Sequence, residues 1–330
     1  MEVKRLEFID ALKGFAIFLV IWGHVIMQLG AYPNFIYSII YSFHMPLFFI
    51  LSGFFFKSSL KLTLKDFLFK KSFQLLYPWF LWCLIVGVQQ AFFHHMDNTN
   101  YLQKMILLFN RWFWFLRDLW LSYFFAYILY KIFKKGYLVA ILGILFVICT
   151  PLLKIQSFYF PLFLFGILLK DNYSLIIKHL NKFLFISFFI FTACLFYFDD
   201  QHLSAFPNLF SHETYSYACP NIYHSLFRWI VGISGSVFFF TLFKKTYREN
   251  FFYSYLSKKG YYTLGIYIVQ TIILEIILPI IPLQNVYKWN YVMAFTPIIS
   301  LITLEICTSI IKFVSKNKKI TKLLFGSSYS

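Results

Sequence analysis

Ten apolar stretches separated by short polar segments dominate the sequence. A helix needs about 20 predominantly apolar residues to cross the hydrocarbon core of a bilayer, and most of the stretches approach that length. We therefore expect an all-α, polytopic membrane protein of about ten transmembrane helices, with one domain over residues 1–330 and no soluble domain. The predicted spans are 8–29, 36–56, 68–93, 112–133, 137–153, 157–169, 183–198, 225–243, 262–281 and 290–313.

The charge of the chain supports this topology. Hydrophobic residues make up 60% of the sequence and charged residues 13%, a ratio that no soluble fold of this size needs. The net charge is +17, but 23 of the 30 lysines and arginines fall in the termini and alternate connecting segments. The positive-inside rule then places both termini in the cytoplasm. This bias explains the basic charge without a nucleic-acid partner, and it favours contact with anionic membrane lipid.

Three polar residues interrupt the first span, which is too long to be a cleavable signal peptide. Lys13 and His24 are 11 positions apart, which places them about 16 Å apart along a helix and within about 20° of the same face. Asp10 lies one turn before Lys13, at pairing distance. Buried polar groups of this kind usually face a protein interior or a cavity. The alternative is an interfacial pair with a snorkelling Lys13, and a His24 that hydrogen-bonds a neighbouring helix.

The second span carries a histidine close to a proline. His44 is followed by Met45 and Pro46, and a proline inside a helix frees a backbone carbonyl and favours a kink. The pair Ser52-Gly53 near the end of the span allows another backbone to approach closely.

Further motifs follow along the chain, and the full set is Asp10-x-x-Lys13-Gly14 with His24, Phe43-His44-Met45-Pro46-Leu47-Phe48-Phe49, Ser52-Gly53-Phe54, Trp112-Phe113-Trp114-Phe115-Leu116, Phe160-Pro161-Leu162-Phe163-Leu164-Phe165-Gly166, and the segment from Gly260 to Tyr267. In this order, these segments resemble acyltransferase family three, whose members are integral-membrane O-acyltransferases of bacterial surface polysaccharides and similar acceptors. The resemblance covers nearly the whole chain.

The resemblance implies an acyltransferase, with acetyl transfer the leading expectation, in the bacterial cytoplasmic (inner) membrane. The donor would be cytoplasmic acetyl-CoA or another acyl-CoA, and the acceptor a hydroxyl of an extracytoplasmic carbohydrate. Lys65, Lys70 and Lys71 would hold the phosphates of the donor. Two positions depart from the family pattern. Gln74 stands where members usually carry a second arginine, and Gln270 where many carry a histidine.

Acyl transfer from a thioester to a hydroxyl needs a base, donors for the oxyanion and exclusion of water. We expect His24 to be the base, because imidazole accepts protons near neutral pH; a transient acyl-histidine stays open. Lys13, held by Asp10, would orient the donor. The remaining candidate substrate-binding residues are His44, Trp112, Trp114, Arg117 and Asp118. For Arg117 and Asp118 the alternative is a structural salt bridge with another helix, and for the tryptophans an interfacial anchor.

Other polar residues lie in or near the spans. Arg228 opens the eighth span, where we expect anchoring rather than function. Glu275 and Glu305 lie in apolar helices and could face a cavity, pair with a cation or stay protonated. The longer outer loops, 94–111 and 199–224, contain histidines and carboxylates that form a solvated surface or hold a polar substrate. We expect no metal, because no compact ligand spacing appears.

Two other classes of function compete with the enzyme. A transporter or flippase for a lipid-linked sugar would also have ten spans and buried polar residues, but it would not need the lysine–histidine stripe. A signalling or structural membrane protein would tolerate the loss of His24. Hydrolysis of a thioester that depends on His24 would separate the enzyme from both.

Overall fold

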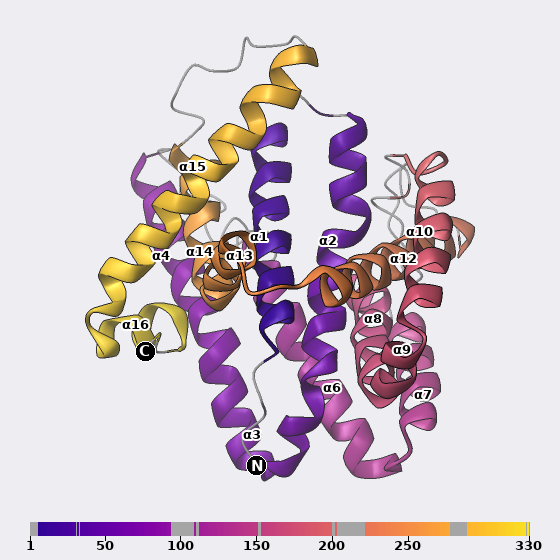
Figure 1. Cartoon of the computed structure of the whole chain (residues 1–330). Coiled ribbons are helices and arrows are strands. Elements are labelled where there is room, and N and C mark those ends of the chain that lie inside the picture. The colour runs from indigo at the N-terminus through magenta and orange to yellow at the C-terminus, as the bar shows by residue number, and fades with distance from the viewer. Residues whose placement is uncertain are drawn as a thin grey trace.

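The computed structural model describes residues 6–30, 32, 34–93, 109, 112–150, 153–199, 202, 222–277, 289–327 and 329, and these form helices and connections without a strand (Figure 1). The principal helices are α1 (Glu7–Gln28), α2 (Phe35–Phe54), α3 (Leu64–Lys71), α4 (Tyr77–Phe93), α6 (Trp114–Phe133), α7 (Gly136–Cys149), α8 (Lys154–Asp171), α9 (Tyr173–Lys178), α10 (Leu180–Leu195), α12 (Ile222–Thr246), α13 (Phe251–Tyr261), α14 (Thr263–Ile272), α15 (Trp289–Ser315) and α16 (Lys318–Phe325). Three short elements join them: a 3₁₀ helix η1 (Phe56–Lys61) and two π-helices, η2 (Ser72–Leu76) and η5 (Ile273–Ile277).

Each predicted span, as far as it is described, coincides with one of these helices or with two or three consecutive elements, so the all-α class is confirmed for the described residues. By length and composition, five of the described helices can cross a membrane. They are Glu7–Gln28, Phe35–Lys61, Leu64–Gln89, Tyr223–Thr246 and Ala294–Ser315. The count of ten spans and the placement of the termini stay predictions.

Helices α1 and α2 stand side by side at the centre of the molecule (Figure 1). Helix α1 packs against α13 and α15, whereas α2 packs against α8 and α12. Both central helices are largely buried, and most of their apolar side chains belong to the core. Lateral helices such as α7 and α10 instead expose large apolar side chains, as expected of surfaces that face lipid.

Two glycines hold α1 and α13 in direct backbone contact. A Cβ atom on Gly14 would overlap the carbonyl of Leu256, and one on Gly260 would overlap the carbonyl of Asp10. Small residues at such crossings allow helix backbones to approach closely in a membrane. The contact therefore fixes the Asp10 end of α1 against α13.

A second reciprocal pair joins α2 to α8. A Cβ atom on Gly53 would overlap the carbonyl of Phe163, and one on Gly166 would overlap the carbonyl of Ile50. The close approach predicted at Ser52-Gly53 is confirmed. All four glycines lie in the segments that carry the family resemblance, so part of that resemblance reflects packing rather than chemistry.

Helix α2 continues through Pro46 to Phe54. Pro46 has no backbone N–H to donate. One turn earlier, two side chains bond back to the helix: the Ser42 hydroxyl donates to the Ile39 carbonyl at 2.7 Å, and the His44 Nδ1 bonds to the Ile40 carbonyl at 2.6 Å. Side chains thus supply hydrogen bonds next to the defect, as expected where a helix carries a proline in a membrane.

Candidate active site

A cavity of about 510 Å³ opens beside the half of α1 that carries His24. It is bounded by α1, α2, α8, α12, α14, η5 and the start of α6 with the segment before it, and it combines aromatic, cationic and acidic side chains. The lining residues are Val20, His24, Met27, Tyr37, Tyr41, His44, Met45, Trp112, Phe113, Trp114, Ile155, Tyr159, Arg228, Tyr267, Thr271 and Glu275. Four of the predicted site residues, His24, His44, Trp112 and Trp114, therefore come together here.

His24 lies next to the carboxylate of Glu275 in the lining of this cavity. Its Nδ1 lies 3.7 Å from Oε1 of Glu275, and the two side chains are 22% and 19% exposed. His24 comes from α1 and Glu275 from the π-helix η5, so residues 251 positions apart in the sequence meet at this point. Of the alternatives predicted for Glu275, the structure realises the cavity-facing one, next to an imidazole.

His44 lines the same cavity with a defined tautomer. Its Nδ1 lies 2.6 Å from the carbonyl oxygen of Ile40, and a carbonyl only accepts, so Nδ1 carries the proton. The lone pair is then on Nε2. The ring also packs edge-on against Tyr41, with 4.8 Å between the centroids. A neutral imidazole held in this way can accept a hydrogen bond from a ligand hydroxyl.

Arg228 is a buried residue of the cavity wall, which corrects the expectation that it serves as an anchor. It is 6% exposed, and its guanidinium lies 3.8 Å from the centroid of the Phe158 ring. Its Nη2 donates to the Tyr159 hydroxyl at 3.4 Å. Cation–π contact is strongest where the cation is removed from water, and it offsets part of the cost of this burial.

The two predicted tryptophans flank a strained residue. Phe113 lies between Trp112 and Trp114 with φ at +51°, in the left-handed region that bulky side chains rarely adopt. Its ring is buried and packs edge-on against Tyr267. Such strain persists only where the surroundings impose it, and it is concentrated at functional sites. The turn presents the tryptophans on either side of Phe113 to one cavity.

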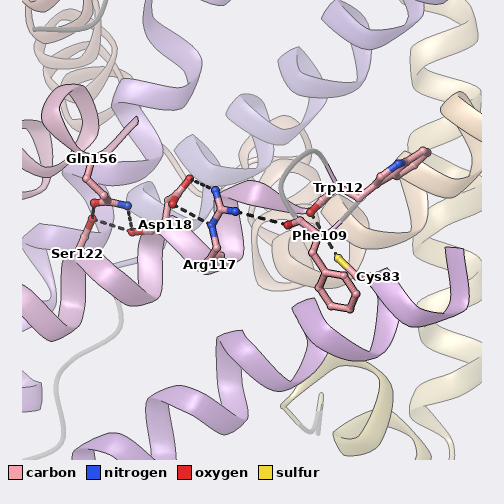
Figure 2. A network of polar contacts seen from close by, with 7 residues as sticks. All are labelled: Cys83, Phe109, Trp112, Arg117, Asp118, Ser122 and Gln156. Carbon is pink, nitrogen blue, oxygen red and sulfur yellow. Dashed lines mark hydrogen bonds and ion pairs between the residues drawn. The ribbon is translucent and has the colours of Figure 1, made fainter. Parts of the chain in front are cut away.

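Arg117 and Asp118 do not line the cavity. Their ion pair is formed within α6 and not with another helix, the structural alternative that we considered: Nε of Arg117 lies 3.2 Å from Oδ1 of Asp118 and Nη2 lies 3.3 Å from Oδ2 (Figure 2). Contact with another helix comes instead through Gln156 of α8, whose Nε2 donates to the Asp118 carbonyl at 2.9 Å and whose Oε1 accepts from Ser122 at 3.1 Å. Arg117 also donates to the carbonyl of Phe109. This network supports the start of α6, directly behind the tryptophans.

Asp10 and Lys13 lie away from the cavity of His24. Lys13 Nζ is 3.7 Å from Asp10 Oδ1 and 5.1 Å from the centroid of the Phe55 ring. Asp10 lines a second, more open cavity of about 950 Å³, together with Glu7, Tyr247, Lys258, Lys312 and other polar residues. The predicted acid–base pair is present, but the structure separates it from His24.

The second cavity is polar at its rim. The Tyr247 hydroxyl donates to a carboxylate oxygen of Glu7 at 2.5 Å, and this hydrogen bond raises the pKa of Tyr247 to about 12. The Ser257 hydroxyl donates to the Glu7 carbonyl at 3.1 Å. These contacts tie the start of α1 to α13 and to the end of α12.

The three lysines predicted to bind the donor lie near the joint of α3 and η2. Lys65 and Lys70 are exposed, and Lys71 is partly buried with its Nζ 3.8 Å from the centroid of the Tyr123 ring. None of them lines the cavity of His24. Tyr123 in turn donates to the carbonyl of Ser52, so this cluster contacts the end of α2.

The structure also shows the surroundings of Glu305 and Gln270, two polar residues that the sequence placed in apolar spans. Glu305 pairs with a cation, accepting from Lys259 Nζ at 2.6 Å and from the Tyr255 hydroxyl at 2.5 Å. Gln270 is fully buried and donates to the Thr271 hydroxyl at 2.8 Å. Gln270 does not line the cavity, whereas Thr271 does.

Of the histidines and carboxylates in the predicted outer loops, the structure describes Asp199, His202 and His224. Asp199 and His202 pair at 2.6 Å between Oδ1 and Nδ1. His94, His95, Asp97, Asp200, His212 and Glu213 lie outside the described residues. Within the described ranges, no group of three or more histidines, cysteines or carboxylates has the arrangement of a metal site.

The sequence profile of the family described as "Acyltransferase domain", acyltransferase family 3, matches residues 6–311. The chain belongs to this acyltransferase family. Its relatives include the nodulation protein NolL of Sinorhizobium fredii, which is 26% identical over 208 residues. That match covers 58% of this chain, and it spans 56% of the length of NolL. No solved structure matches the chain.

Family membership confirms the resemblance, and the structure adds residues that sequence reasoning had not placed in the site. The sequence predicts an anchoring role for Arg228 and leaves three alternatives for Glu275, and it marks Phe113 only as part of a motif. For Arg228 and Glu275, the available signal was the cost of a charge in an apolar span. That signal marks a residue as unusual but does not say which cavity it faces.

Proposed function

We propose that this chain is a membrane O-acyltransferase that moves an acyl group, most simply acetyl, from a cytoplasmic acyl-CoA to a hydroxyl of an extracytoplasmic carbohydrate. The observation that carries the proposal is the position of His24. In a member of an acyltransferase family, it lines a cavity of about 510 Å³ with a second histidine, an arginine and two tryptophans. This volume lies within the range of about 300–1,000 Å³ that is usual for small-molecule sites.

The proposed reaction is direct transfer. One ring nitrogen of His24 takes the proton of the acceptor hydroxyl as its oxygen attacks the thioester carbonyl. Negative charge develops on the carbonyl oxygen, and the buried guanidinium of Arg228 is our candidate to stabilise it. The C–S bond then breaks, the ester forms, and the CoA thiolate takes the proton back from the imidazolium. Atoms and charge balance without a metal or a redox step.

The acceptor would occupy the aromatic part of the cavity. Trp112 and Trp114 offer faces on which a sugar ring can stack, and the lone pair of His44 Nε2 offers an acceptor for one of its hydroxyls. In this account Arg117 and Asp118 act on the acceptor indirectly, by supporting the segment that carries the tryptophans. Trp114 is itself packed against Tyr159, with 5.3 Å between the ring centroids.

The donor would come from the opposite, cytoplasmic side. We assign its phosphates to Lys65, Lys70 and Lys71, and its pantetheine arm to a path between helices towards His24. Lys13, paired with Asp10, would orient this arm. The charge bias of the sequence supports this direction, because the three lysines belong to a segment predicted to lie on the cytoplasmic side of the bacterial inner membrane.

The proposal is tested with the full chain reconstituted in lipid vesicles. Acetyl-CoA is supplied on one face, surface glycan extracted from the host is supplied on the other, and the release of free CoA is measured together with base-labile acetyl on the glycan. We expect both products to appear in equal amounts and only with both substrates. Movement of glycan across the vesicle membrane without loss of the thioester would instead support a transporter.

A further inference from the structure

We propose that Glu275 is a positioning residue for His24: its carboxylate accepts a hydrogen bond from Nδ1–H and thereby leaves Nε2 as the base. This inference rests on the proposed acyl transfer for its kinetic consequences. The proximity of the two groups is a property of the structure, and the hydrogen bond between them is testable without activity.

The geometry points to a specific ring nitrogen. Nδ1 of His24 lies 3.7 Å from Oε1 of Glu275, and it makes no hydrogen bond within the described residues. A shift of less than about 1 Å would bring the two atoms to hydrogen-bond distance. Catalytic hydrogen bonds are often long in the absence of substrate and tighten when substrate binds.

The backbone around Glu275 is unusual in a way that affects the cavity. Helix α14 ends at Ile272 and the chain continues as a π-helix, η5, that contains Glu275. An extra residue per turn changes which side chains face the cavity, and such π segments are frequent at functional sites. Thr271 and Glu275, four positions apart, both line the cavity across this junction.

The other ionisable groups around the cavity have different partners. His44 Nδ1 is bonded to a backbone carbonyl, and Arg228 lies over Phe158 and beside the Tyr159 hydroxyl. Tyr37, Tyr41 and Tyr267 complete the ionisable groups of the described lining. Glu275 is the carboxylate in the described lining, so it is the group suited to an imidazole that must become positive during the reaction.

The chemistry follows from the two ring nitrogens. A neutral imidazole carries one N–H, and a carboxylate at Nδ1 favours the tautomer with its proton there. When Nε2 takes the hydroxyl proton, the ring becomes an imidazolium that the carboxylate stabilises without taking a proton itself. Glu275 would therefore act on the rate of proton transfer and not on the binding of either substrate.

The test compares Glu275→Gln and Glu275→Asp with a matched control, Glu305→Gln, which makes the same change in an apolar helix away from the cavity. Each full-length protein is reconstituted with acetyl-CoA and surface glycan. We expect Glu275→Gln to lower kcat about 10- to 100-fold with both KM values unchanged, and Glu275→Asp to recover part of the loss. The control keeps the wild-type kcat. A raised KM at unchanged kcat would overturn the inference.

The second readout is the tautomer of His24, measured by ¹⁵N solid-state NMR on protein labelled at histidine. The His24 signals are identified by their loss in His24→Gln. We expect wild type to carry the proton on Nδ1 and Glu275→Gln to lose that preference. If the wild-type tautomer is Nε2–H, or survives in Glu275→Gln, the pairing is wrong. A correct tautomer in a protein that transfers no acyl group would instead reject the proposed function alone.

Discussion

The two halves of α1 contain similar polar residues in very different surroundings. Near its start, Asp10 and Lys13 pair with each other, and Gly14 brings the backbone onto the Leu256 carbonyl of α13. Three turns later, His24 borders a cavity of about 510 Å³. The half with Lys13 and Gly14 is packed in backbone contact with α13, although its Asp10 also lines the polar cavity. The half with His24 borders the cavity that two tryptophans, His44 and Arg228 share.

This difference distinguishes two roles that a buried polar residue can have, a structural or orienting role and a catalytic role. In the packed half, a charge is tolerated because a partner is one turn away, and the role left for it is to hold the helix or to orient a ligand arm. In the half that carries His24, a titratable ring lies next to the Glu275 carboxylate and borders a cavity large enough for a substrate. These are the requirements of a catalytic base. Substitutions in the two halves test that division.

Removal of the imidazole should produce the largest loss. We expect His24→Ala to lower kcat by about 10²- to 10⁴-fold, which corresponds to about 3–5 kcal/mol of transition-state stabilisation. The thermal unfolding temperature should stay near that of wild type, because the side chain borders a cavity. Steady-state kinetics and a melting curve on the same preparation make the comparison. A melting temperature that falls in step with kcat would show a structural role instead.

The packed half should respond to added volume. We expect Gly14→Ala to lower the free energy of unfolding by about 1–3 kcal/mol, because a Cβ there would overlap the Leu256 carbonyl and backbone cannot move aside as a side chain can. Unfolding in detergent measures the loss. Gly136→Ala is the control, since its nearest neighbour is the Tyr130 hydroxyl at 3.2 Å, and it should be tolerated. Equal stability of the two variants would contradict the packed contact.

Lys13 should affect the donor and not the chemistry. We expect Lys13→Ala to raise the KM for acyl-CoA about tenfold, or about 1.4 kcal/mol, with a kcat close to that of wild type. Lys13→Arg, which keeps the positive charge, should restore most of the affinity. Initial rates over a range of acetyl-CoA concentrations give both constants. A kcat loss as large as that of His24→Ala would place Lys13 at the reacting atoms and undo the division of α1.

Substitution of Glu305, a carboxylate outside both halves of α1, should have the smallest effect on activity and stability. Glu305→Gln keeps an acceptor for Tyr255 and for Lys259, so we expect the free energy of unfolding to fall by only about 1 kcal/mol. Acyl transfer should be unchanged. Differential scanning calorimetry and the vesicle assay test the two statements. A drop in activity at normal stability would extend the site to the contact between α13 and α15.

The sequence predicted the helices well because apolar length is a local property. It also named His24, His44 and the two tryptophans, each carried by a recognisable motif, and the structure brings these four to one cavity. Their roles in a reaction stay predictions. The meeting of His24 with Glu275 was not predictable, because it depends on a π-helix and on the packing of segments at opposite ends of the chain.

The predictions for Arg228, Arg117 and Asp118 were incomplete for a related reason, because the partners of these residues depend on the tertiary fold. Arg228 opens a span, where a cation most often anchors a helix, and only the tertiary fold shows that it is buried over Phe158. Arg117 and Asp118 looked like partners for other helices or for a substrate, but their geometry makes them partners of each other. Helical periodicity says which residues share a face, and it does not say what that face meets.

The central claim is that acyl transfer occurs in the cavity beside His24. Its most direct test is the base-labile acyl content of surface glycans, measured by mass spectrometry in cells that carry wild type, His24→Ala, Glu305→Gln or no copy, at equal protein levels. We expect acyl groups with wild type and Glu305→Gln, and background levels with His24→Ala and with no copy. Normal acylation in cells that carry His24→Ala would contradict the account.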